Sequence, residues 1–110
     1  MIQIIIKKKD DRFVSYEING HASSGTGEFE FDVVCADVSV LSITTANNFE
    51  RMAQFTPITQ MDDGYLYVEI PSDLSDEQQE MAQILFQAFV YAITEVIEEF
   101  PDYTNITFTS

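Results

Sequence analysis

The chain has 110 residues, 45% of them hydrophobic, which is enough for one domain over residues 1–110 with a core of its own. Its formal net charge is −14, and this acidity excludes direct binding of nucleic acid, which needs a basic surface, and disfavours anionic membranes. No uninterrupted apolar run approaches the roughly 20 residues of a membrane span, and the single cysteine excludes an internal disulfide and indicates a reducing, cytoplasmic compartment.

Two short strands are predicted near the N-terminus. Apolar residues recur at every second position over residues 2–6 and 14–18, and this alternation is typical of strands with one buried face. A polar turn separates the two strands. Glycine, serine and threonine then cluster at positions 23–27, which predicts a loop over residues 20–31.

A helix is expected to begin at Asp32, because aspartate is a good N-cap, and to end before Pro57. Residues three or four positions apart are mostly apolar along this segment, as in a helix with one buried stripe. The stripe consists of Val34, Val38, Leu41, Thr45, Phe49 and Met52.

A β-hairpin follows, with the dipeptide Asp63-Gly64 as its turn. The alternation in its second arm places Leu66, Val68 and Ile70 on the inner face of a sheet. The hairpin therefore adds two strands to the two predicted at the N-terminus.

The clearest helix comes next. Ser75 and Gln78 form a capping box at its start, and Pro101 ends it. Over residues 81–93 this helix is apolar on more than one face, so the other helix or a second subunit must cover what a sheet leaves exposed. Residues 103–109 are predicted as a last strand.

The predicted order of elements is β-β-α-β-β-α-β. Each strand pattern shows one apolar face, which predicts a mostly antiparallel sheet of about four to five strands with two helices packed on one face. The fold class is therefore α+β. The other face of the sheet is expected to be solvated or to form a dimer interface.

The only histidine, His21, and the only cysteine, Cys35, lie on either side of the predicted loop. If Asp32 caps the helix, Cys35 is its third residue, where unpaired N–H groups and the helix dipole favour a thiolate and could hold an oxyanion. A loop can fold back and bring an imidazole to this thiol, first as base and then as acid for the leaving amine. The spacing therefore permits a Cys/His catalytic dyad.

The same residues have plain structural interpretations. A lone cysteine in an apolar run is more often a small buried residue than a nucleophile, and a lone histidine after Asn-Gly is more often a turn residue. Asp32 is first of all an N-cap. Ser39, one helical turn after Cys35, is by default a small residue at a packing contact.

No metal or other cofactor is indicated. One cysteine and one histidine fall short of the three or four protein ligands that zinc usually takes. Gly25 and Gly27 resemble part of a phosphate-binding loop, but no lysine follows them and the full pattern is absent.

Two short blocks, Gly20-His21-Ala22 and the run DVVCADVS over residues 32–39, resemble the signature of the ribosomal-processing cysteine protease (Prp) family. Length, element order, the DGYLYVEIP hairpin and the long C-terminal helix are also similar to that family, so the resemblance covers essentially the whole chain. Two positions depart from the pattern: Glu30 stands where the family has a glycine, and Asp37 where it often has an alanine.

The resemblance implies a bacterial, cytoplasmic endopeptidase that removes a short N-terminal extension from a large-subunit ribosomal protein by cutting after an aromatic residue. It implies that His21 is the catalytic base and Cys35 the nucleophile, and that Asp32 and Ser39 line the same pocket. It also implies a homodimer. An acidic enzyme would attract a basic ribosomal protein, at a rate that falls with added salt.

Two other functions stay open on the sequence. The chain could be a non-catalytic acidic module that binds a basic ribosomal protein during assembly, with Cys35 inert in the core. It could also be a redox-sensing protein whose single thiol forms a disulfide across a dimer.

Overall fold

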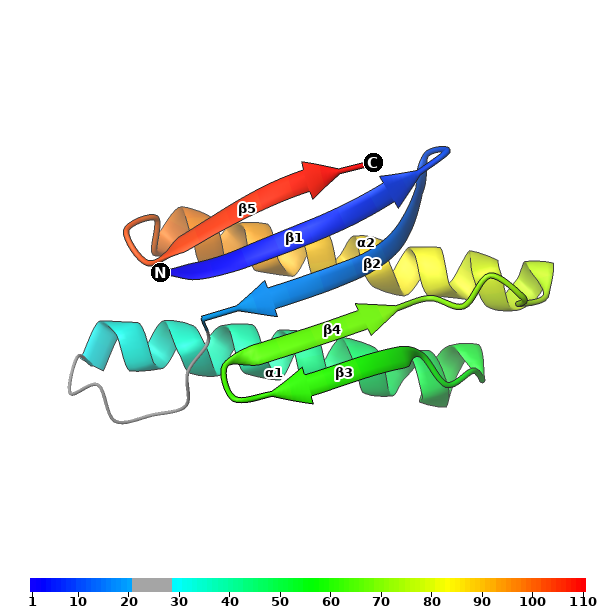
Figure 1. Cartoon of the computed structure of the whole chain (residues 1–110), viewed down its shortest axis with the longest axis horizontal. Coiled ribbons are helices and arrows are strands. Elements are labelled where there is room, and N and C mark those ends of the chain that lie inside the picture. The colour runs from blue at the N-terminus through cyan, green and yellow to red at the C-terminus, as the bar shows by residue number, and fades with distance from the viewer. Residues whose placement is uncertain (21–28) are drawn as a thin grey trace.

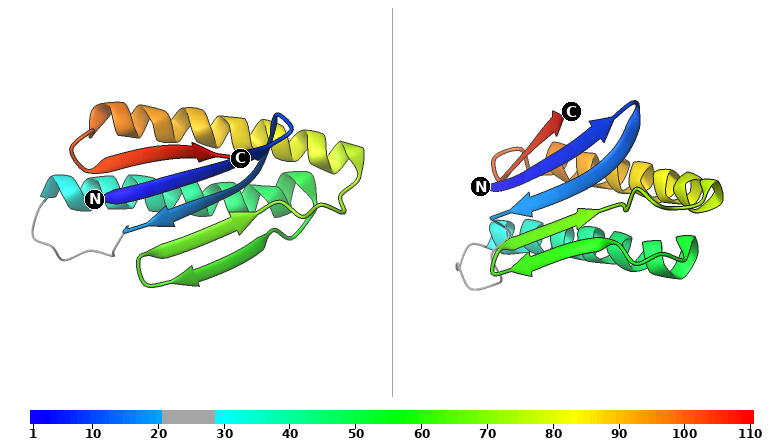
Figure 2. Two further views of the ribbon diagram at one scale, coloured as in Figure 1. Left: turned by 45° about the horizontal axis from the view of Figure 1, so that its top comes forward. Right: turned by 45° about the vertical axis from the view of Figure 1, so that its right-hand side comes forward.

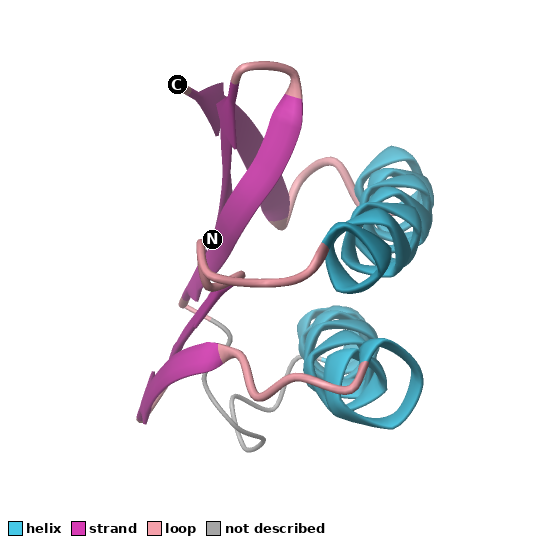
Figure 3. Cartoon of the chain, turned by 90° about the vertical axis from the view of Figure 1, so that its right-hand side faces the viewer, coloured by secondary structure: helices cyan, strands magenta, loops and turns pink. Residues whose placement is uncertain are grey.

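The computed structural model describes residues 1–20 and 29–110. It contains a five-stranded sheet with two helices packed against one of its faces, so that the chain forms two layers (Figure 1, Figure 3). This arrangement confirms the predicted α+β class and the predicted order of elements. The elements are β1 (Ile2–Lys9), β2 (Arg12–Asn19), α1 (Phe29–Ala53), β3 (Ile58–Asp62), β4 (Tyr65–Glu69), α2 (Asp76–Glu99) and β5 (Thr104–Thr109).

The strands lie in the order β3-β4-β2-β1-β5. Neighbouring strands are antiparallel except β1 and β5, which run parallel. The parallel pair arises because α2 carries the chain back to the end of the sheet where β1 begins (Figure 1). The sheet is therefore mixed but mostly antiparallel, as predicted.

The two N-terminal strands follow the predicted alternation with one correction. The isoleucines at even positions of β1 are fully buried. The register with β2 shifts between Lys7 and Lys8, and this bulge turns Phe13 toward the helices in place of the predicted Val14. Phe13 stacks on Phe86 of α2 with 4.6 Å between ring centroids, so the bulge adds an aromatic contact to the core.

Tyr16 of β2 connects the sheet to both helices. Its side chain is fully buried, and its hydroxyl donates a hydrogen bond of 2.6 Å to the carbonyl oxygen of Ser42 in α1. Its ring stacks on Phe89 of α2 with 4.4 Å between centroids. Burial raises the pKa of Tyr16 far above its ordinary value, so the hydroxyl remains a donor.

The predicted hairpin is confirmed. β3 and β4 pair antiparallel, and Asp63 and Gly64 form the turn between them. Leu66, Val68 and Ile70 are all buried, as the alternation predicted. The second arm of the hairpin, β4, therefore contributes to the core, whereas every residue of β3 is exposed.

The apolar stripe of α1 is largely confirmed. Val34, Val38 and Phe49 are fully buried. Met52, predicted to be buried, is 53% exposed, and the prediction was wrong there. Phe55, which stacks on Phe49 with 5.2 Å between centroids, fills that end of the core instead.

The start of α1 differs from the prediction, because the helix begins at Phe29 and Asp32 lies inside its first turn. Acidic side chains in a first turn are stabilised by the helix dipole. Tyr103, just before β5, also supports this turn: its ring centroid lies 5.9 Å from that of Phe31, and its hydroxyl lies 3.4 Å from Oε2 of Glu30. These contacts come from a residue distant in sequence, so the local pattern did not reveal them.

α2 begins with the predicted capping box: the Ser75 hydroxyl accepts from the N–H of Gln78, and the Gln78 side chain accepts from the N–H of Ser75. By length and composition alone α2 could cross a membrane, which a count of uninterrupted apolar runs did not show. The core helix of a globular protein passes the same test, and α2 packs against the sheet and α1. The buried residues of α2 are Ala82, Phe86, Phe89, Val90 and Ile93.

Candidate active site

Several chain segments meet at one end of the molecule. β1 and β5 begin there, β2 ends there, α1 begins there and α2 ends there, and the views in Figure 2 agree with Figure 1 on this placement. Backbone hydrogen bonds join the segments: the N–H of Ile2 donates to the carbonyl of Tyr103, and the N–H of Gly20 donates to the carbonyl of Gly64, both at 2.8 Å. The predicted site residues of α1 belong to this end.

Gly20, directly after β2, has a conformation that favours glycine. Its φ is +89°, a region that residues with a Cβ rarely adopt. A Cβ at this position would also lie 2.7 Å from the carbonyl oxygen of Met1, which is closer than real Cβ atoms approach other atoms. The glycine of the Gly20-His21-Ala22 block therefore has a physical role: it lets the chain leave β2 tightly against β1.

Cys35 lies in the second turn of α1, because it is the seventh residue of a helix that begins at Phe29. Its side chain is 5% exposed and belongs to the hydrophobic core. Burial raises the pKa of the thiol above its ordinary value of 9.0, and the carboxylate of Asp32 raises it further. The positively charged amino terminus of Met1 acts in the opposite direction.

This corrects the prediction for the helix start. The sequence placed Cys35 in the first turn, where free N–H groups would favour a thiolate, but the helix extends further toward the N-terminus. Burial and the Asp32 carboxylate instead favour the protonated thiol. A neutral thiol becomes a nucleophile only when a base removes its proton, so the arrangement can support thiol chemistry that depends on a base.

The other predicted site residues are distributed as follows. Asp32 is half-buried in the first turn of α1 and close enough to Cys35 to affect its pKa, so it is not the N-cap that was predicted. Ser39 is half-buried one turn after Cys35, and its carbonyl accepts a hydrogen bond of 3.2 Å from the Ser42 hydroxyl. His21 lies outside the described residues, so its contact with Cys35 stays a prediction.

Two contributors to this end of the molecule were missed at the level of sequence. The positive charge of the Met1 amino terminus lowers the pKa of the Cys35 thiol, and Tyr103 contacts Glu30 and Phe31 in the first turn of α1. Only the parallel pairing of β5 with β1 brings Tyr103 to this place, and parallel pairing leaves no local signal. Over residues 1–20 and 29–110, no group of three or more His, Cys, Asp or Glu side chains is placed to hold a metal ion.

Comparisons with known proteins agree with this description. The family model described as cysteine protease Prp matches residues 1–105. The ribosomal processing cysteine protease Prp of Bacillus subtilis (strain 168) is 30% identical over 110 residues, which cover 97% of this chain and 96% of the relative. Such a match extends over both layers of the fold.

Solved structures match equally well. SMU.848 from Streptococcus mutans superposes with a TM-score of 0.88 at 37% identity and covers 99% of this chain and 94% of its own. The essential ribosomal processing protease Prp from S. aureus, in complex with a substrate peptide, has the same fold with a TM-score of 0.84 at 20% identity, covering 99% of this chain and all of its own. The family model matches almost the whole chain, and the B. subtilis relative aligns with it over almost the full length of both proteins. This chain therefore belongs to the Prp family of cysteine proteases.

Proposed function

We propose that this chain is an endopeptidase that removes a short N-terminal extension from a bacterial large-subunit ribosomal protein, cutting after an aromatic residue. The whole-length similarity to the ribosomal processing protease of B. subtilis supports this substrate class. The observation that carries the proposal is that a member of a cysteine protease family has one cysteine in 110 residues. Cys35 is therefore the only thiol available as a nucleophile.

The proposed base is His21, the only histidine in the chain. The raised pKa of Cys35 supports a base-dependent step, since the thiol must lose its proton when it attacks. In this step the sulfur bonds to the scissile carbonyl carbon while the imidazole takes the thiol proton. The C–N bond then breaks, the imidazolium gives its proton to the leaving amine, and water hydrolyses the thioester.

Asp32 and Ser39 are proposed to line the same pocket. Asp32 is near enough to Cys35 to disfavour the thiolate, and the same negative charge would favour a protonated imidazole. Ser39 lies four residues after Cys35 on α1 and so on the same side of the helix. In this proposal Asp32 stabilises the imidazolium and Ser39 supplies a hydroxyl beside the peptide.

The substrate, the compartment and the assembly complete the proposal. Ribosomal proteins are basic, and a net charge of −14 would speed their encounter with the enzyme at low salt. The enzyme is proposed to act in the cytoplasm as a homodimer. Light scattering of the purified protein tests the dimer, and cell fractionation tests the compartment.

The decisive experiment incubates the protein with the extended ribosomal protein and identifies the products by mass spectrometry. Cys35→Ala and His21→Ala should each reduce cleavage by at least about 10³-fold with the circular dichroism spectrum unchanged. Val38→Ala, a comparable truncation in the same core, should keep most of the activity and controls for lost packing. Undiminished cleavage by Cys35→Ala would refute the nucleophile, and tight binding without cleavage by the unmodified protein would favour a non-catalytic acidic module.

A further inference from the structure

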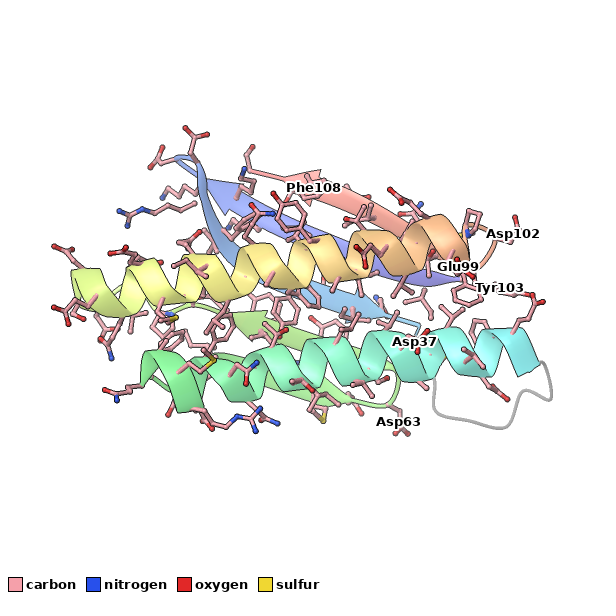
Figure 4. All side chains as sticks on the ribbon, turned by 180° about the vertical axis from the view of Figure 1, so that it is seen from behind. Asp37, Asp63, Glu99, Asp102, Tyr103 and Phe108 are labelled. Atoms are coloured by element: carbon pink, nitrogen blue, oxygen red, sulfur yellow. The ribbon has the colours of Figure 1, made fainter. Side chains whose placement is uncertain are left out.

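A groove runs between the two helices on the outer surface of the helix layer, near the end where α1 begins. Asp37 on α1 and Glu99 on α2 both line it, and Figure 4 shows them at the same end of the layer. Its volume is about 450 Å³, within the range of sites that hold ligands. We call it the α1–α2 groove; its lining consists of Ala36, Asp37, Val40, Leu41, Ala92, Glu95, Val96, Glu99 and Phe100.

The groove belongs to a longer apolar surface. A second hollow of about 240 Å³ shares Val40, Leu41 and Ala92 with it and continues along both helices. Val40, which lines both hollows, is 62% exposed. Since 28% of the most apolar stretch of α2 is buried, much of its apolar surface faces outward, and such continuous exposure marks an interaction site.

The charge around the groove has one sign. Its lining includes the carboxylates of Asp37, Glu95 and Glu99 and no lysine or arginine. The basic residues of the chain lie at the opposite end of the molecule (Figure 1). Four of them lie at the β1–β2 turn or beside it, and Arg51 lies in the last turn of α1. An occupant of the groove must therefore supply apolar side chains and positive charge together.

A second copy of this chain is a poor occupant on these grounds. Two copies joined groove to groove would bring Asp37, Glu95 and Glu99 of one copy against the same three carboxylates of the other. A polypeptide segment with apolar side chains and lysine or arginine complements the groove in both respects.

The position of the groove relates such a segment to the catalytic thiol. Ala36, in the groove lining, follows Cys35 directly, so their Cα atoms are about 3.8 Å apart. The thiol faces the core while the groove lies on the outer side of the same helix. A helix is roughly 10 Å across, and an extended chain advances about 3.3 Å per residue, so a few residues pass from one side of α1 to the other.

We propose that the α1–α2 groove binds a basic, apolar segment of the protein substrate while the scissile bond lies at Cys35. This inference rests on the proposed function and deepens it, because it assigns part of substrate recognition to a surface outside the catalytic pocket. Asp37, Glu95 and Glu99 attract the basic side chains, and Val40 and Ala92 receive the apolar ones.

The test compares two triple variants with equal loss of charge. The groove variant carries Asp37→Asn, Glu95→Gln and Glu99→Gln, and the control variant carries Glu50→Gln, Asp73→Asn and Glu80→Gln at exposed positions outside the α1–α2 groove. Each is assayed on the full-length extended ribosomal protein and on a neutral peptide that spans only the cleavage point. An exposed ion pair contributes a factor of about two to five, so the groove variant should lose about tenfold in kcat/KM on the protein at low salt. It should stay within about twofold on the neutral peptide, as the control variant should on both substrates.

A binding measurement separates failure of the groove from failure of the proposed function. In a Cys35→Ser background, the extended ribosomal protein should bind about tenfold more weakly to the groove variant than to the control, whether or not the enzyme cleaves it. If both variants lose the same amount of binding affinity, or if neither loses any, the groove proposal is wrong and the protease proposal stands. Val40→Glu should also weaken binding; if it instead converts a dimer to monomers in light scattering, a second copy covers the groove and the proposal is wrong. Absence of cleavage of either substrate by the unmodified enzyme would count against the proposed function alone.

Discussion

Replacing Gly20 by alanine should destabilise the fold more than any other glycine substitution among the described residues. An L-residue in the left-handed region costs about 1–2 kcal/mol, and forcing an atom into an occupied site costs about 1–3 kcal/mol. The new Cβ would lie 2.7 Å from the carbonyl oxygen of Met1. This oxygen cannot move away freely, because the N–H of the next residue, Ile2, donates a hydrogen bond to the carbonyl of Tyr103. The free energy of unfolding should therefore fall by about 2–5 kcal/mol, a large part of the roughly 5–15 kcal/mol of a typical domain.

Urea unfolding followed by circular dichroism measures this change. With a slope of about 2 kcal/mol per molar urea, the midpoint should fall by roughly 1–2.5 M. Gly64→Ala is the matched control, because Gly64 also has a positive φ, +68°, in the hairpin turn and should lose only the conformational contribution of about 1–2 kcal/mol. A Gly20→Ala midpoint within experimental error of the unmodified protein would refute the reasoning, and a loss equal to that of Gly64→Ala would refute the part that rests on Met1.

Three further predictions follow from the described contacts. Tyr16→Phe leaves a buried carbonyl of α1 without its donor and should lower the free energy of unfolding by about 1–3 kcal/mol in the same urea assay. Cys35 should react with iodoacetamide more slowly than a free thiol at neutral pH, because its raised pKa keeps the thiol protonated, and the reaction should become faster as the pH rises beyond 9.0. Asp32→Asn should speed the reaction by lowering the pKa of Cys35. Mass spectrometry measures the label. Glu17→Gln should lower the pKa of Tyr65 from about 12 toward 10.0 in an ultraviolet titration of tyrosinate, because the hydrogen bond and negative charge of Glu17 favour the protonated phenol.

Most of the fold follows from local sequence signals. The alternation of isoleucines in β1, the Asp63-Gly64 turn and the capping box at Ser75 each depend on neighbours within a few residues, and each prediction is confirmed. The position of β5 beside β1 depends on how α2 spans the sheet, which no local pattern encodes. The same holds for the bulge between Lys7 and Lys8, since a pattern of period two continues through it unchanged.

The candidate site was less predictable than the fold. Residue types and the two-block motif indicated Cys35 and Asp32, but their electrostatic environment depends on where α1 begins. Phe31 and Glu30 belong to the helix and contact Tyr103. The earlier start of the helix places Cys35 in the second turn instead of the first. The predicted shift of the thiol pKa therefore had the wrong sign, and the catalytic role of Cys35 stays a prediction.

The corrected environment of Cys35 also separates the proposed protease from a redox sensor. Oxidation by peroxide follows thiolate character and exposure, and this thiol is 5% exposed with a raised pKa. A disulfide across a dimer needs two sulfur atoms about 2 Å apart, which a side chain packed in the core of its own subunit does not reach while α1 stays in place. A thiol that is unreactive until a base takes its proton suits an enzyme that must spare other proteins in the cell. The family match, and not the burial of the thiol, carries the protease assignment. In the proposed mechanism, the chemistry begins when a substrate and a base meet Cys35 together.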